Sequence, residues 1–273
     1  MRIFLFFVFP AILWAQTYEI TKMGVASKKP SSDVFMKYKP MADYLSRRVY
    51  SDLVKGDVKL RIFKSEKELR KAILQKEIYF ARLTPQSYIM LKERMPGLGL
   101  VAGELLNHQF QNKGILIVQK ANFVRNYSHF KSKSFAFGPK TSALLDIVPK
   151  SILASKGLKM SDIKPKYLSD IEKIKHFVEV GRVIGGVIPV QALSDDEQDR
   201  FRIFSEYSAP GNVWVITKNV FLSTREKIQA ELLNTLEPHV SRVLQIDGFV
   251  KVNNRDLDEF RSDMRKAMAF HRK

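Results

Sequence analysis

The sequence predicts an α/β protein of two lobes, each a mainly parallel sheet flanked by helices. Apolar strand-like runs alternate with helical patterns along nearly the whole chain, which is typical of sheets covered by helices on both faces. A polar stretch at residues 122–133 separates a first set of these units from a second. The 273 residues, 45% of them hydrophobic and 27% charged, are enough to bury one large core or two smaller ones.

The first set of units begins near residue 18. Ser65 is expected to cap a helix, with Glu68 three residues later completing a capping box. Pro85 opens the following helix, and Gly97 ends it. Strands are expected at residues 18–25, 58–63, 78–83, 98–104 and 115–118, and helices at 34–49, from 66, and at 85–95.

The second set follows the polar stretch. Strands are expected at residues 134–137, 164–168, 183–188, 201–207 and 213–217, and helices at 141–156, 169–180, 223–236 and 256–270. Long strands near residues 113–120 and 208–217 are expected to cross between the lobes as a hinge. The predicted division places residues 16–114 with 214–273 in one lobe and 115–213 in the other.

Residues 1–15 have the pattern of a secretory signal peptide. Arg2 is followed by an apolar run at residues 3–14, and Ala15 offers a small residue before a cleavage point. The run has 12 residues, whereas about 20 are needed to cross a bilayer. A core strand or an interfacial helix is the alternative, because Leu13 stands where a small residue is usual. We expect an exported, periplasmic protein.

Composition limits the function further. The chain has no cysteine, which excludes disulfides, thiolate catalysis and iron–sulfur clusters. The net charge of +18 leaves a nucleic-acid partner as an alternative, which the predicted export argues against. Residues 105–145 contain no Asp or Glu, so this region is expected to attract an anion or an anionic membrane surface.

The block at residues 135–142 is the sharpest local feature. An apolar strand ends at a Gly138–Pro139 turn, and a helix is expected to begin directly after it. The first N–H groups of a helix lack intrahelical acceptors and carry a positive partial charge. With Lys140, Thr141 and Ser142 they predict a cradle for an oxyanion. Alternatively, these hydroxyls only cap the helix.

Two further strand-to-helix turns have similar chemistry. In the turn at residues 83–88, Thr84 and Ser87 could cap the helix, and Tyr88 could face a cleft. In the third turn, Ser169 and Asp170 open a helix. Because ligands of such folds bind at the carboxyl ends of parallel strands, the three turns predict a shared pocket between the lobes.

Catalytic and metal-binding patterns are weak by comparison. The five histidines are scattered, none at a metal-ligand spacing, and no nucleophile elbow, phosphate-binding loop or dinucleotide fingerprint is present. We therefore predict no catalytic residue, no metal and no cofactor.

The ordered set of segments resembles one family of proteins. These segments are residues 24–25, 38–45, 68–83, 84–88, 135–138 and 212–215. They are similar to the PhnD-like phosphate-, phosphite- and phosphonate-binding proteins of ABC importers, which are type II periplasmic binding proteins. The resemblance implies a two-lobe fold that closes on a ligand, no catalysis, and delivery to a membrane permease. It also implies that Tyr38, Tyr88, Thr141 and Ser142 contact the ligand.

The chain departs from this family pattern in two ways. The usual serine–threonine–serine–glycine loop reads Lys-Thr-Ser-Ala at residues 140–143, and a loop histidine is replaced near Ile171. The carboxylates that would pair with a ligand's amino group are replaced by Ile184 and Pro189. A simple oxyanion such as phosphate, phosphite or a related inorganic anion is therefore favoured over an aminophosphonate.

We thus predict a monomeric periplasmic solute-binding protein for an ABC importer that captures a small anion. The alternative is a sensor with the same fold that presents the anion to a membrane kinase. An enzyme and a nucleic-acid binder are the less favoured classes. The candidate ligand-binding residues are Tyr38, Tyr88, Lys140, Thr141, Ser142 and Ser169.

Overall fold

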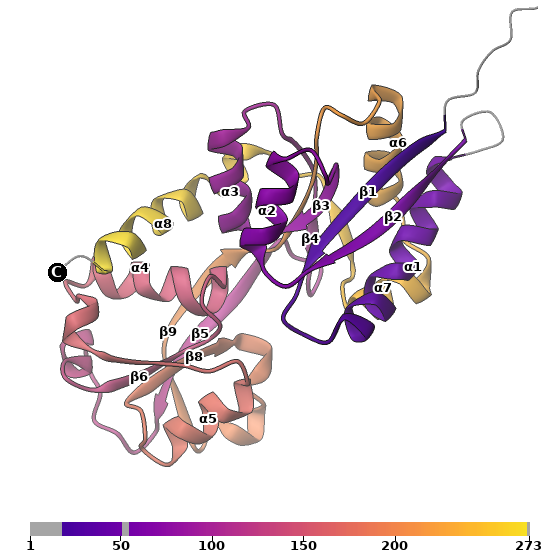
Figure 1. The fold of residues 1–273 in the computed structure, drawn as a ribbon. Helices are drawn as coiled ribbons and strands as arrows, with labels where there is room; N and C mark the ends of the chain where they lie inside the picture. Colours follow the sequence, from indigo (N-terminus) through magenta and orange to yellow (C-terminus); the bar gives the residue numbers. More distant parts are fainter. Residues whose placement is uncertain (1–17, 51–54, 272–273) are drawn as a thin grey trace, which may run out of the picture.

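The computed structural model describes residues 18–50 and 55–271. The predicted signal peptide lies outside these ranges. Two lobes, each with its own sheet and flanking helices, are joined by chain crossings near the middle of the molecule (Figure 1). The predicted α/β, two-lobe class is therefore confirmed.

The first lobe contains a six-stranded sheet in the order β11-β4-β10-β3-β1-β2. Strands β1, β2 and β3 are parallel, so their carboxyl ends meet at one edge. Strand β10 runs antiparallel to both β3 and β4. The strands are β1 (Glu19–Ala26), β2 (Gly56–Phe63), β3 (Phe80–Leu83), β4 (Gly99–Leu105), β10 (Val213–Ile216) and β11 (Gly248–Val250).

Helices cover both faces of this sheet, because each face carries its own apolar cluster. On one face, Phe80 stacks on Trp214 with ring centroids 4.9 Å apart. The helices of that face are α1 (Ser31–Val49), α6 (Leu222–Leu233) and α7 (Pro238–Leu244), and those of the other are α2 (Glu66–Leu74) and α3 (Pro85–Arg94).

The second lobe contains a five-stranded sheet in the order β7-β6-β8-β5-β9. Helix α4 (Val148–Ser155) and helix α5 (Ile171–Glu179) pack on different apolar clusters of this lobe. The strands are β5 (Gln111–Gln119), β6 (Ser134–Phe137), β7 (Lys164–Tyr167), β8 (Gly185–Pro189) and β9 (Phe201–Pro210).

The chain crosses between the lobes twice, after β4 and after β9. At the return crossing, the Gly211 N–H donates to the Phe110 carbonyl at 2.7 Å. A Cβ at position 211 would lie 2.9 Å from the Glu104 carbonyl oxygen, so the two crossings pack closely only because this residue is glycine. The residue-level lobe boundaries remain a prediction.

Helix α8 (Asp258–Phe270) connects the two lobes from outside (Figure 1). It follows the first sheet in the chain but runs beside α4, where Ser151 donates to Asp263 at 2.6 Å. Phe270, at its end, lies in the core of the second lobe. Helix α8 was expected in the first lobe. It follows that lobe in the chain, but it also packs against the second.

Three details of the prediction are wrong. Both sheets are mixed rather than mainly parallel, because the crossing and returning strands run against the β–α–β strands. The segment after α6 also contains α7 and strand β11, where only helix was expected. The helix expected from residue 141 begins with a wide turn at Ala143–Ile147, and Pro149, which has no N–H, stands in the first turn of α4.

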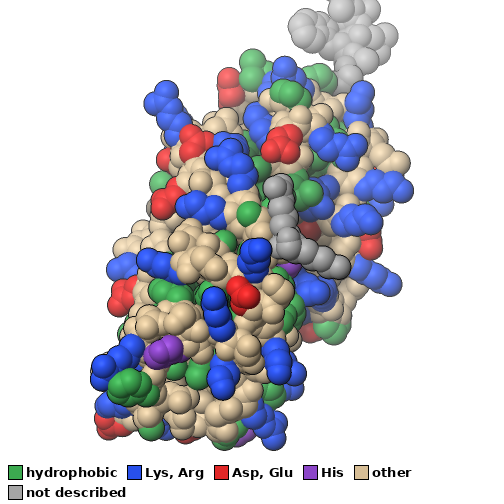
Figure 2. Space-filling model, turned by 90° about the vertical axis from the view of Figure 1, so that its left-hand side faces the viewer, with side chains coloured by type: hydrophobic (Ala, Val, Ile, Leu, Met, Phe, Trp, Pro, Cys, Tyr) green, Lys and Arg blue, Asp and Glu red, His purple; other side chains and the backbone are tan. Residues whose placement is uncertain are grey.

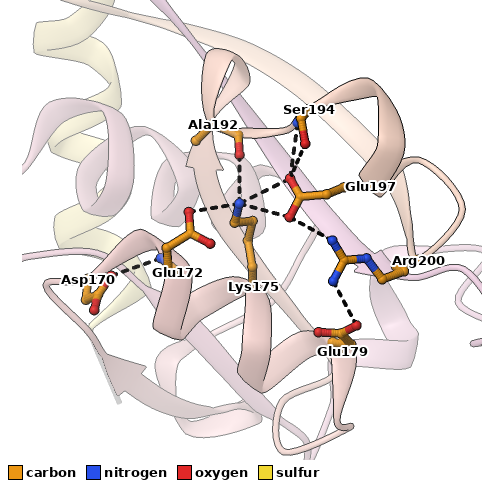
Figure 3. A network of polar contacts seen from close by, with 8 residues as sticks. All are labelled: Asp170, Glu172, Lys175, Glu179, Ala192, Ser194, Glu197 and Arg200. Carbon is orange, nitrogen blue, oxygen red and sulfur yellow. Dashed lines mark hydrogen bonds and ion pairs between the residues drawn. The ribbon is translucent and has the colours of Figure 1, made fainter.

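A network of ion pairs fastens α5 to the segment before β9 (Figure 3). The Lys175 ammonium lies 2.8 Å from a carboxylate oxygen of Glu172 and 3.0 Å from one of Glu197, and it donates to the Ala192 carbonyl. Burial raises the pKa of Glu197, but its hydrogen bond with Lys175 and the hydrogen bonds from Ser194 outweigh burial and hold that pKa below its ordinary value.

We predict that Glu197→Gln lowers the thermal midpoint at pH 7 by roughly 4 °C, since it removes charge-assisted hydrogen bonds. Because the folded-state pKa of Glu197 is depressed, its stabilisation is present above its ordinary value of 4.5 and is lost as pH falls through the folded-state pKa. Thermal melts at pH 7 and pH 3 should show the difference from wild type shrinking in acid. An equal difference at both pH values, or an equal effect of the exposed Glu226→Gln control, would contradict this assignment.

Candidate functional site

A cavity of about 290 Å³ lies between the two lobes. Its walls come from four chain segments that meet there: the β3–α3 turn, strand β5, the turn after β6, and the β9–β10 crossing. The lining residues are Thr84, Pro85, Asn112, Pro139, Lys140, Thr141, Ser142, Ala143, Leu144, Pro210, Gly211 and Asn212. The structure thus has a cavity between the lobes and at strand ends, where the sequence predicts the ligand pocket.

The turn after β6 forms the second-lobe wall. Lys140, Thr141 and Ser142 all line the cavity. The Ser142 Oγ accepts from the Leu145 N–H at 3.1 Å, so this hydroxyl does cap the helix. A serine hydroxyl that accepts one hydrogen bond still has its own proton to donate. The capping and ligand-binding interpretations of Ser142 are therefore compatible.

Thr141 has a strained backbone, with φ at +76°. Its N–H donates to the Asp146 carboxylate at 3.0 Å, which holds the turn in this shape. Asp146 forms an ion pair with Lys150, and their side chains are only 7% and 6% exposed. Because Lys150 neutralises this carboxylate, the positive charge of Lys140 stands uncancelled beside the cavity.

Thr84 provides the matching group on the first-lobe wall. Its Oγ1 accepts from the Ser87 N–H at 3.3 Å and caps α3. Like Ser142, it lies at the start of a helix, lines the cavity and retains a proton to donate. Two capping hydroxyls, one from each lobe, thus face the same cavity.

Arg82 is a residue that sequence reasoning missed. It lies one residue before the end of β3 and makes two hydrogen bonds with Glu104, at 2.6 and 2.8 Å. Glu104 also accepts from the Trp214 indole at 3.0 Å and from the Asn212 amide at 3.2 Å. Since Asn212 lines the cavity, this cluster supports its first-lobe side.

The charges of Arg82 and Glu104 compensate each other. Burial raises the pKa of Glu104, but the guanidinium of Arg82 outweighs it and holds that pKa below its ordinary value. For Arg82, burial lowers the pKa and the charge of Glu104 raises it above its ordinary value. Both groups stay ionised. The sequence feature that could have identified Arg82 is a lone arginine inside an otherwise apolar strand.

Tyr38 lies in the core of the first lobe, on α1, and is 7% exposed. The guanidinium of Arg82 and the ammonium of Lys37 both lie 5.9 Å from the centroid of its ring. Burial raises the pKa of Tyr38, so its hydroxyl keeps its proton. Tyr38 is not among the residues that line the cavity. It lies beside Arg82, which supports the first-lobe wall from behind.

The structure places the two other candidates elsewhere. Tyr88 is fully buried, and its hydroxyl lies 2.6 Å from the Asn254 side chain, because its position on α3 faces the core rather than the cleft. Ser169 is exposed beyond β7, and Asp170 caps α5 instead. Neither lines the cavity. Among residues 18–50 and 55–271, no cluster of His, Asp and Glu has the arrangement of a metal site.

A protein-family profile matches residues 23–257 and describes the periplasmic substrate-binding protein of phosphonate ABC transporters. Solved structures with the same fold include a Xanthomonas citri protein bound to chloride, with a TM-score of 0.74, 12% identity, and 92% and 98% of the two chains covered.

Two further structures extend the comparison. PhnD1 from Prochlorococcus marinus, in complex with methylphosphonate, has a TM-score of 0.69 at 15% identity, covering 90% of this chain and 97% of its own. The aliphatic sulphonate binding protein SsuA from Escherichia coli has a TM-score of 0.55 at 14% identity, covering 93% and 94%. At these identities the likeness concerns the fold.

We predict that Glu104→Gln destabilises the protein by about 3 kcal/mol or more, because it leaves the Arg82 charge buried without a partner. Urea unfolding measures the change. The double variant Arg82→Met/Glu104→Gln should recover part of the loss. A single variant within about 1 kcal/mol of wild type would mean that the pair does not hold this wall.

Proposed function

The chain belongs to the family of periplasmic phosphonate-binding proteins of ABC transporters, and from this premise we propose that it captures a small phosphorus oxyanion between its lobes. The proteins of this family are substrate-binding components rather than enzymes. They bind small anionic ligands and work with membrane permeases. The family is periplasmic, which fits the export expected from the N-terminal sequence.

One observation carries the proposal. Thr84 and Ser142, whose hydroxyls cap helices of opposite lobes, line one cavity together with the cationic Lys140. A buried anion needs several N–H or O–H donors together with a compensating charge. The helix after Ser142 also begins at this cavity, with Ala143 and Leu144 in its lining, and the first N–H groups of a helix lack intrahelical acceptors.

The lining of the cavity supports a simple oxyanion over an aminophosphonate. The described residues that surround it include Lys140 but neither Asp nor Glu. A ligand's ammonium group would therefore have no carboxylate to pair with, whereas three or four oxygens would find hydroxyl and amide donors. Phosphate, phosphite and short phosphonates have this chemistry, and PhnD1 was solved with such a molecule.

We propose further that the protein acts as a monomer with an ABC permease as its partner. Both walls of the cavity come from one chain, so no second copy is needed to complete it. The family match concerns transporters, which supports a permease rather than a sensor kinase as the partner.

The double variant Lys140→Ala/Thr141→Ala should weaken binding of phosphate and methylphosphonate by at least about 100-fold, since it removes a charge-assisted bond and a hydroxyl. Isothermal titration calorimetry measures this, and the melting temperature without ligand should be unchanged. Lys159→Ala/Ser161→Ala, a matched pair outside the cavity, should bind as wild type. Undiminished affinity in the first variant would refute the proposed second-lobe wall.

Tyr38→Phe should change the affinity for the same ligands by less than about threefold, because Tyr38 does not line the cavity and its hydroxyl has no ligand there to bond. Tyr88→Phe is the control: it should keep the affinity and lose stability, because its hydroxyl is bonded to Asn254 within the core. A loss of about fivefold or more in Tyr38→Phe, the size of one lost hydrogen bond, would instead place Tyr38 in the ligand set.

A further inference from the structure

A groove of about 680 Å³ lies between α2 and α3 on the first lobe. It shares no lining residue with the cavity between the lobes. Four basic side chains converge on it: Lys67, Arg70 and Lys71 from α2, and Arg94 from α3. The groove is therefore a second cationic feature, separate from the proposed anion site.

The charges in this groove are unbalanced. None of the four cations forms an ion pair within the part of the chain that the structure describes, whereas basic residues elsewhere do, as in Arg61–Glu77 and Arg47–Glu237. Glu68 also lines the groove, so its carboxylate offsets one of these four charges and three remain unbalanced. Several like charges around one hollow repel one another, and a bound anion would relieve that repulsion.

The floor of the groove is apolar. On α2, Leu74 follows Lys67, Arg70 and Lys71 at positions that share one helix face. From α3, Met90 lies one turn before Arg94 and is 37% exposed. Basic walls above an apolar floor suit a ligand that has both an anionic group and a hydrocarbon part.

We propose that this groove seats the headgroup of an anionic phospholipid and docks the protein on a bilayer surface. The phosphate would lie among the four cations, and the glycerol and first acyl carbons would lie on Leu74 and Met90. The volume is within the range of sites for one small molecule, about 300–1,000 Å³. The proposal goes beyond anion capture: it places the protein at the membrane in which an importer stands.

The overall charge supports the same partner. A chain of net charge +18 is attracted to an anionic leaflet over several ångströms. Lys and Arg side chains are spread over both lobes on the face shown in Figure 2, so this attraction alone does not select an orientation. Cations that stand beside exposed apolar side chains do select an orientation, as in interfacial membrane binding generally.

A hollow in the second lobe provides a matched comparison. Lys133, Lys164 and Arg182 line a cavity of about 520 Å³ whose other residues are mostly polar. Its charge is similar, but it lacks an exposed apolar floor. If the groove docks lipid as proposed, removing three cations there should matter far more than removing three from this hollow.

The test is co-sedimentation with vesicles of phosphatidylcholine alone and of equal parts phosphatidylcholine and phosphatidylglycerol. Wild type should bind only the second kind. Lys67→Gln/Lys71→Gln/Arg94→Gln should bind on the order of 100-fold more weakly, because each cation near an anionic bilayer contributes about fivefold. Lys133→Gln/Lys164→Gln/Arg182→Gln, with the same net charge, should stay within about threefold of wild type. Arg70 is kept because it donates to Ser87 at 2.6 Å.

Met90→Gln tests the apolar floor independently and should weaken vesicle binding, whereas Met90→Leu should preserve it. Melting temperatures check that every variant is folded. Equal losses in the two triple variants would overturn the proposal in favour of diffuse attraction. It would also be overturned if the groove variant kept its affinity for the vesicles, or if Met90→Gln bound them as tightly as wild type.

Discussion

A small anion leaves water only where hydroxyl and amide donors and a positive charge replace its hydration, and the arrangement of this molecule follows from that requirement. Parallel strands bring helix starts to one edge of each sheet, and the two edges face each other across the hinge. Thr84 and Ser142 lie at those helix starts, and Lys140 precedes one of them. The Asp146 carboxylate, which accepts from the Thr141 N–H, forms an ion pair with Lys150, so it shapes the turn without cancelling the charge of Lys140.

The crossing between the lobes depends on a second pair of compensating charges. Arg82 and Glu104 are ionised inside the first lobe, and Glu104 accepts hydrogen bonds from Trp214 and from Asn212 at the crossing. The crossings approach so closely at Gly211 that only glycine fits. This cluster thus supports the first-lobe wall of the cavity, whereas the turn at Lys140 belongs to the second lobe.

Much of this could be predicted from the sequence, because most of it is local. The alternation of apolar runs gave the strands within a few residues, and the 134–142 block joined a strand, a turn and donor groups in nine consecutive positions. Strand β11 has only three residues, too few for a periodic pattern, and the antiparallel returns depend on pairings between distant segments. Arg82 was missed because its partner lies 22 residues away. Tyr88 was misplaced because helix rotation decides which face meets the core, and spacing from the turn does not reveal it.

The most direct test of the central claim is a calorimetric and thermal-shift panel on the purified protein with phosphate, phosphite, methylphosphonate, sulfate and a nucleotide. A site of the proposed kind should bind one of the phosphorus oxyanions with a stoichiometry of one. At about 100 times its dissociation constant, that ligand should stabilise the protein by about 2.7 kcal/mol. No response to any phosphorus oxyanion, or a stronger response to the nucleotide than to all of them, would contradict the proposed ligand class.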